Sequence, residues 1–174
     1  MKPFIGIKKI WYGDVITSAV TKTSLKTWLG TATEVENSHQ DTWGYTEDDP
    51  NYTDYINELN GSIYYRDVTQ KGAKTIAFTM GVFSFDDKVD LQGGEKVDTD
   101  AGWAASDTPG IINKAIVGQT KTGNYIVFTN AAVIAKGNVV EKNIGLGVTA
   151  VAMENPSAGV KSDYMFDGEK VDAA

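Results

Sequence analysis

The chain of 174 residues contains no cysteine, a single histidine and only four prolines. Without cysteine, disulfides, thiolate metal sites and cysteine nucleophiles are excluded. One histidine also excludes metal sites built from several histidines. That histidine, His39, lies in a polar turn with no nucleophile near it in the sequence, so we interpret it as an ordinary exposed turn residue.

Long apolar runs are also missing. No run approaches the ~20 apolar residues that a membrane-spanning helix needs. The N-terminal stretch MKPFIGIKKIWYGD reaches charged residues before any apolar segment of signal-peptide length. We therefore expect a soluble protein that is made in the cytoplasm and has no membrane partner.

The chain has no excess of positive charge; its formal net charge is −7. Surfaces that wrap nucleic acid through its phosphates are basic, so this class of binding is disfavoured. The content of 41% hydrophobic and 22% charged residues is typical of a folded protein. We expect residues 1–174 to form a single domain, because a chain of this length can bury a sizeable core without cross-links.

Strand patterns dominate the chain and predict a mainly β fold. In residues 142–153, KNIGLGVTAVAM, the apolar side chains share one parity, while Gly145, Gly147 and Thr149 share the other. Residues 74–83 show the same alternation, and the side that carries small side chains consists of Thr75, Ala77, Thr79 and Gly81. The other strand candidates are residues 4–12, 31–36, 41–45, 52–59, 62–69, 111–120, 124–130 and 131–136.

Three segments depart from the strand pattern. Residues 84–92 predict one short helix, with Ser84 as N-cap and two aspartates in the first turn; residues 24–29 are a weaker candidate. Residues 94–110 look like a long loop, a feature that is often functional. Trp103 within it has little local core, which favours contact with another chain. We expect residues 155–174 to be a short strand and a polar tail, flexible or peripheral.

No catalytic or cofactor-binding motif is present, so we expect neither an enzyme nor a cofactor or metal site. Asp86, Asp87 and Asp90 are explained by helix capping and solvation. The stretch DTDAG resembles a calcium loop but lacks its later ligands. The GLG of residues 145–147 lies within a strand and has no following helix to bind phosphate.

The tryptophans and a pair of neighbouring tyrosines leave two interpretations open. They could form a sugar-binding platform, or they could fill the core and interfaces, where aromatic residues are enriched. These residues are Trp11, Trp28, Trp43, Trp103, Tyr64 and Tyr65.

The order of segments resembles the major tail proteins of long-tailed bacteriophages. The segments are FIGIKKIWYGD, LNGSIYY, GAKTIAFTMGVF with a short acidic helix and GG, NYIVFTNAAVIA, and GVTAVAM. The resemblance covers most of residues 1–153. It implies a β-sandwich or small β-barrel with one short flanking α-helix and a long loop, as in type VI tube proteins. Six subunits would close a ring, and the rings would stack into a hollow tail tube.

The resemblance offers a role for the two small faces. Gly145, Gly147, Thr149, Thr75, Thr79 and Gly81 would line the bore of the tube, or else meet a close-packed neighbour. Residues 94–110, with Val97, Trp103 and Ile111, are the first candidate for an inter-subunit arm, and a hairpin over residues 61–83 is the second. Six copies at −7 each would make the bore acidic, so that DNA slides through it without binding.

The resemblance also implies partners and a location. The partners would be further copies of the chain, the tape-measure protein, the tail terminator and the baseplate proteins. The location would be the tail of the virion, after assembly in the host cytoplasm. The alternative is a β-sandwich module of a tail or pilus component that binds carbohydrate or a cell surface.

Overall fold

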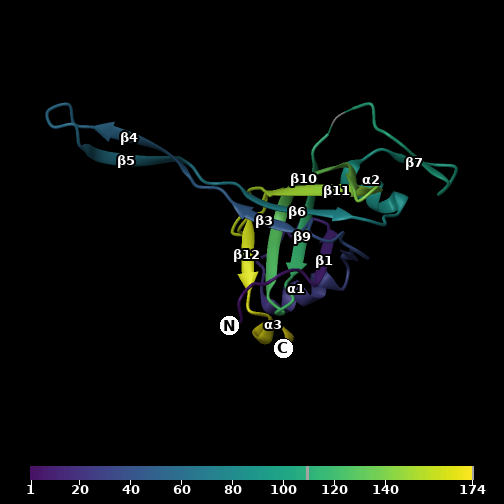
Figure 1. The fold of residues 1–174 in the computed structure, drawn as a ribbon. Coiled ribbons are helices and arrows are strands. Elements are labelled where there is room, and N and C mark those ends of the chain that lie inside the picture. Colours follow the sequence, from purple (N-terminus) through teal and green to yellow (C-terminus); the bar gives the residue numbers. More distant parts are fainter. Residues whose placement is uncertain (109, 174) are drawn as a thin grey trace.

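The computed structural model describes residues 1–108 and 110–173. Within them, eight antiparallel strands form one large sheet (Figure 1). Its order is β2-β1-β9-β10-β11-β6-β3, and β12 pairs with β10 beside this path. The strands are β1 (Lys9–Gly13), β2 (Thr33–Glu34), β3 (Gly44–Glu47), β6 (Lys74–Met80), β9 (Ile112–Gln119), β10 (Tyr125–Val140), β11 (Asn143–Ala152) and β12 (Asp163–Phe166). The expected mainly β fold is confirmed.

The long strand β10 joins two halves of this sheet. Its first residues pair with β9 and β12, and its later residues pair with β11. The register to β9 shifts between Phe128 and Ala131, where the strand passes from one half to the other. Strands β6 and β11 consequently run crosswise to β1 and β9 (Figure 1). The sequence predicts two strands here, 124–130 and 131–136, because no local pattern shows that one strand continues through the irregularity.

The main core lies between the two halves. Side chains from β1, β9 and β10 meet those of β6 and β11, and Leu91 of the helix α2 (Phe85–Gln92) closes one end. The largest fully buried members are Tyr12, Ile76, Phe78, Met80, Leu91, Ile116, Phe128, Leu146 and Val148. The alternating apolar residues of β6 and β11 face this core, as their parity predicts.

A second core covers the opposite face of β1, β9 and β10. Helix α1 (Lys22–Leu29) packs there through Leu25, and helix α3 (Gly168–Asp172) through Val171. Helix α1 confirms the weaker helix candidate of residues 24–29, whereas α3 was not predicted. The second core also recruits Tyr164 and Phe166 of β12. Residues 155–173 thus pack against the sheet, because their few apolar side chains cover β10, whereas a flexible or peripheral segment was expected.

Helix α2 has the ends that its sequence predicts. Ser84 Oγ accepts a hydrogen bond from the Asp87 amide at 3.1 Å, and Asp87 Oδ2 accepts one from the Ser84 amide at 2.7 Å. This reciprocal pairing is a capping box. The other carboxylate oxygen of Asp87 accepts from the Tyr12 hydroxyl at 2.6 Å and so fixes the helix to β1.

Two small hairpins lie outside the main sheet. Strands β7 (Glu95–Val97) and β8 (Gly102–Ala104) pair within the segment expected to be an irregular loop. Strands β4 (Asn51–Ile56) and β5 (Ile63–Gln70) form a hairpin that projects far from the body (Figure 1). The expected hairpin over residues 61–83 was wrong, because β5 pairs with β4 whereas β6 pairs with β3 and β11.

Candidate functional site

The two small strand faces predicted from the sequence form one continuous surface. Gly147 pairs with Thr79 and Thr149 pairs with Ala77, so the small sides of β11 and β6 lie side by side. Strand β10 extends this surface on one flank and β3 on the other. We call it the small-residue face; it comprises Gly44, Thr46, Thr75, Ala77, Thr79, Ala132, Ile134, Lys136, Asn138, Gly145, Gly147, Thr149 and Val151.

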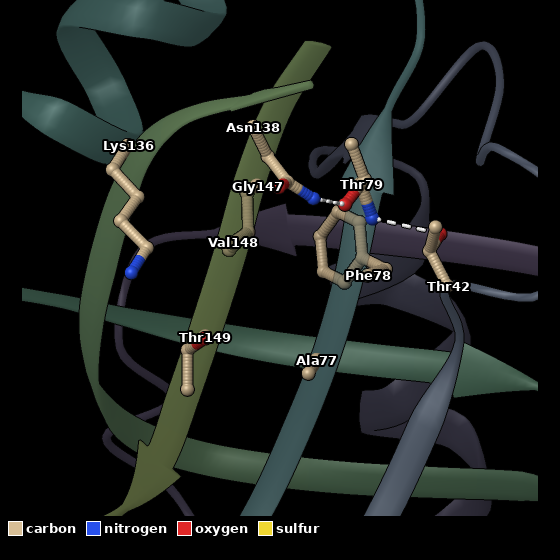
Figure 2. A pocket seen from close by; sticks show the side chains of 9 residues that line it. All are labelled: Thr42, Ala77, Phe78, Thr79, Lys136, Asn138, Gly147, Val148 and Thr149. Carbon is tan, nitrogen blue, oxygen red and sulfur yellow. Dashed lines mark hydrogen bonds between the residues drawn. The ribbon is translucent and has the colours of Figure 1, made fainter. Parts of the chain in front are cut away.

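A side chain from a more distant strand explains the glycine at position 147. Asn138 of β10 reaches across β11 and donates a hydrogen bond from Nδ2 to Thr79 Oγ1 of β6 at 3.0 Å (Figure 2). A Cβ atom at Gly147 would lie 2.9 Å from the Cβ of Asn138. The bare backbone at Gly147 therefore gives this bridging side chain its path.

Gly145 and Gly81 are also closely approached from within the chain. A Cβ atom at Gly145 would lie 2.6 Å from the Met80 carbonyl oxygen. The Gly81 amide donates to Asn37 Oδ1 at 2.8 Å, and the Gly81 carbonyl accepts from Asn143 Nδ2 at 2.8 Å. These glycines allow neighbouring backbone and polar side chains to come close, which makes this end of the face tightly packed.

The middle of the small-residue face is hollowed. A hollow of about 290 Å³ lies over β6 and β11, and its lining includes Thr42, Thr79, Lys136, Asn138 and Thr149 (Figure 2). Thr42 Oγ1 accepts a hydrogen bond from the Thr79 amide at 3.0 Å. Because Thr79 is 4% exposed and Thr149 is exposed, the surface is deepest over β6.

The charge of this face differs from the acidic wall that the net charge suggested. Among its strand positions Lys136 is the one charged residue, and it is exposed. Much of the negative charge lies elsewhere, for instance at Asp86 and Asp100 beside Lys96. Hydrogen bonds that Lys96 donates to Asp100 and Asp86 raise the pKa of Lys96. The small-residue face is therefore nearly neutral, with one cation.

Val97 and Trp103 lie together in the β7–β8 hairpin, whereas Ile111 lies just before β9. The Trp103 indole N–H donates to the Gly93 carbonyl at 2.8 Å, and the Lys88 ammonium lies 3.9 Å from the centre of a Trp103 ring. Trp103 thereby fastens the β7–β8 hairpin to α2. Val97 is 41% exposed and Ile111 is 76% exposed, at separate places along the chain. Few apolar residues lie near Trp103 in the sequence, but the folded chain places it against α2.

The predicted strands 52–59 and 62–69 correspond to β4 and β5, and their hairpin, which we call the arm, carries the pair Tyr64 and Tyr65. Every residue of β5 is exposed, and large apolar side chains occur along both strands and the tip. They are Tyr52, Tyr55, Ile56, Leu59, Ile63, Tyr64, Tyr65 and Val68, with exposed fractions from 45% to 94%. The available signal was this concentration of apolar residues on both parities, which a half-buried strand would not show.

Pairs of side chains within the arm hold its two strands together. Arg66 donates to both carboxylate oxygens of Asp54, at 2.6 and 2.9 Å, and its guanidinium lies 4.0 Å from the centre of the Tyr52 ring. The hydrogen bond from Arg66 lowers the pKa of the Asp54 carboxyl. Tyr55 and Tyr65 are paired across the strands with ring centres 5.7 Å apart. These contacts stabilise an arm that has no sheet of the body beneath it.

Metal-binding groups and membrane-spanning helices were sought among the described residues. Within residues 1–108 and 110–173, no group of three or more acidic or histidine side chains is placed to hold a metal ion. No helix in the same residues is long and apolar enough to cross a membrane. His39 is partly buried, not freely exposed as expected: its amide donates to the Thr79 carbonyl at 2.7 Å, and its Nε2 lies 3.7 Å from Glu141.

Comparison with known proteins leaves the family open. No protein-family model matches the chain, and no curated protein matches it.

Proposed function

We propose that this protein is a structural subunit that assembles into stacked hexameric rings and forms the tail tube of a long-tailed bacteriophage. In this role it conducts the genome and carries out no reaction. The observation that carries the proposal is the sheet of β3, β6, β11 and β10, which has one face on the core and small residues on the other.

The small-residue face suits the wall of a narrow channel. A wall made mainly of glycine, alanine and threonine takes little space and offers DNA hydroxyl groups but few charges to hold its phosphates. Six subunits would place six copies of Lys136 around the bore. DNA would then adhere weakly to the wall because the wall is nearly neutral, and not because it is acidic.

The outer strands of the sheet suit closure into a ring. On the path through the sheet, β2 and β3 are the terminal strands, and each pairs with one neighbour among the described residues. An unpaired strand edge is a template for another chain. Joining the β3 side of one copy to another copy in a cyclic arrangement would make the small-residue faces one continuous lining.

The arm suits contact between subunits. A two-stranded hairpin is marginally stable in water on its own, and this one exposes eight large apolar side chains. Burying them against another chain would lower the free energy of the assembled state. In a virion, further partners of such a tube are the tape-measure, terminator and baseplate proteins.

Electron microscopy and size-exclusion chromatography over a concentration series test the proposal. Hollow rings or tubes that form without a ligand would support it. Particles that stay monomeric at every concentration, in the presence as well as the absence of preformed seeds, would contradict it.

The absence of cysteine permits a sharper test of which face lines the bore. Thr149→Cys places one thiol on the small-residue face, and Thr23→Cys places one on the exposed side of α1 as a control. In assembled tubes, a maleimide on a polymer too wide for the bore should label Cys at position 23 only. A small maleimide should label both variants. Equal labelling of both by the wide reagent would exclude the small-residue face from the bore.

A second candidate is a carbohydrate- or surface-binding module, which the exposed tyrosines of the arm favour. Sugar rings stack on aromatic faces, and Tyr52, Tyr55, Tyr64 and Tyr65 are each at least 45% exposed. This function predicts a monomer that binds glycans on an array and loses binding when Tyr64 and Tyr65 are replaced by serine. Self-assembly without any glycan would argue against it.

A further inference from the structure

A row of exposed apolar side chains lies at the end of the sheet where β6 stops. Val139 pairs directly with Ile144, and they are 67% and 70% exposed. Val82 is 65% exposed and follows Gly81, whose carbonyl accepts a hydrogen bond from Asn143 Nδ2, the residue before Ile144. We call Val82, Ile144 and Val139 the apolar row. It extends the core-facing side of the sheet past the end of the core.

We propose that the apolar row of one copy receives the arm of a second copy. This inference rests on the proposed function and names the surface that the arm contacts. The first argument is position. The arm leaves the body beside Lys74, where β6 begins, whereas the row lies beyond Met80, where β6 ends. Figure 1 accordingly shows the arm and the arrowhead of β6 on opposite sides of the molecule.

The second argument is symmetry. An arm that points away from its own body cannot cover a row on the far side of that body. Two apolar surfaces at opposite ends of one chain can cover each other when copies associate head to tail, and such contacts build rings or filaments. The separation of arm and row therefore matches the kind of contact that a tube requires.

The third argument is area. The eight exposed apolar side chains of the arm offer roughly 1,000 Å² of surface, on the usual sizes of these side chains. One side of a standard protein–protein interface buries about 800 Å². The arm thus carries enough apolar surface for a stable contact with a second copy, with the row as the apolar centre of the receiving surface.

Charged residues lie beside both surfaces as well. Glu58 and Asp67 on the arm are exposed, and among the ion pairs of the described residues neither takes part. Glu141 and Lys142 form the turn between β10 and β11, beside the apolar row, and both are exposed, so Lys142 is the cation that can meet the carboxylates of the arm. Opposite charges at the rim of an interface steer association and fix its register.

Complementation between two variants tests the inference. The row variant, Ile144→Asp, puts a charge into the row but leaves the arm intact. The arm variant, with Leu59, Tyr64 and Tyr65 changed to serine, leaves the row intact. Met165→Asp is the matched control, because Met165 is 50% exposed on β12, outside the arm, the apolar row and the small-residue face. Circular dichroism and thermal unfolding establish that each variant is folded.

We expect each of the two variants to need a protein concentration at least about tenfold higher than the parent to reach the same assembly size, since apolar anchors dominate interfaces. Their equimolar mixture should form a species twice the size that either forms alone, because one intact arm meets one intact row. The control should assemble like the parent. Sedimentation velocity measures the assembly size of each variant, of the mixture and of the control.

The failures are distinguishable. If the parent assembles and Ile144→Asp assembles equally well, or the mixture gives no larger species, the row is not the receiving surface, while the proposed function stands. If the parent itself stays monomeric under all conditions, both the proposed function and this inference are overturned.

Discussion

Asn138 and Thr79 lie on strands that are not neighbours, yet a hydrogen bond of 3.0 Å joins Asn138 Nδ2 to Thr79 Oγ1. Strand β11 runs between β10 and β6, and Gly147 is the residue over which the bond passes. The glycine-rich side of β11 is thus explained in part by contacts within the chain. What remains open to solvent is the hollow around Thr149 and Lys136.

Gly147→Ala should destabilise the fold. Its new Cβ would lie 2.9 Å from the Asn138 Cβ, so strand or side chain must shift, at a cost of about 1–3 kcal/mol. Gly44→Ala is the control on the same face, since a Cβ there meets nothing within 4 Å. Urea unfolding measures both. Equal effects of the two substitutions would contradict the role of Asn138.

Gly72→Ala should disturb the arm more than the body. Gly72 lies at the base of the arm, and a Cβ atom there would overlap the Asp48 carbonyl. The amide of Asp48 also donates a hydrogen bond to the Ala73 carbonyl at 2.9 Å. The two segments at the base of the arm therefore cannot move apart without breaking this hydrogen bond. Hydrogen exchange should speed up in residues 48–73, while β9 and β10 stay protected. Gly137→Ala, with nothing within 4 Å of its Cβ, is the control.

Tyr125 should make the protein less stable at alkaline pH. Burial, followed by the negative charge of Asp172 and its hydrogen bond, raises the pKa of the Tyr125 hydroxyl from 10.0 to about 12. Unfolded chains release this proton near pH 10, whereas the folded chain keeps it. The contribution to stability is therefore complete below pH 10 and declines as pH rises toward 12.

Chemical denaturation at pH 9, 10, 11 and 12 checks this dependence. Tyr125→Phe cannot titrate, so its free energy of unfolding should fall less steeply over this range than that of the parent. Tyr12 and Lys74 also have raised pKa values. Both residues are present in parent and variant, so they contribute equally to the pH dependence of the free energy of unfolding in the two proteins. Parallel curves for parent and variant would contradict the prediction.

Asn155→Ala should loosen the C-terminal segment. Asn155 is 7% exposed and donates from Nδ2 to the Ile16 carbonyl at 2.8 Å and to Thr129 Oγ1 at 3.0 Å. Its removal leaves buried groups without partners, at a cost of about 1–3 kcal/mol. Thermal and urea unfolding measure the loss. Asn113→Ala, at an exposed position of β9, should have little effect.

Local patterns predicted much of the fold. The parity of residues 142–153 and 74–83 identified which side chains of β11 and β6 face the core, since strand geometry alone sets that alternation. The helix after Ser84 was predicted with its capping residue, because the capping box lies within four consecutive residues. Such features depend on neighbours in the chain and can be seen without a fold.

Contacts between distant segments could not be predicted in this way. Trp103 looked unsupported until α2 was seen beside it, and residues 155–174 looked peripheral until β12 was seen on β10. The strands 52–59 and 62–69 were predicted, but not that they leave the body as an exposed arm, because that depends on which strands of the body they do not pair with. Each miss concerns a partner far away in sequence, where composition carries little information.

The sequence by itself determined that this protein is mainly β, that β6 and β11 have one bulky and one small side, and that a short capped helix follows β6. These properties follow from backbone geometry and nearest neighbours. Only the tertiary structure decided that the two small sides form one face, that Asn138 spans it, and that the arm and the apolar row lie at opposite ends. Strand pairing brings those residues together, and its register is fixed by the packing of the whole core.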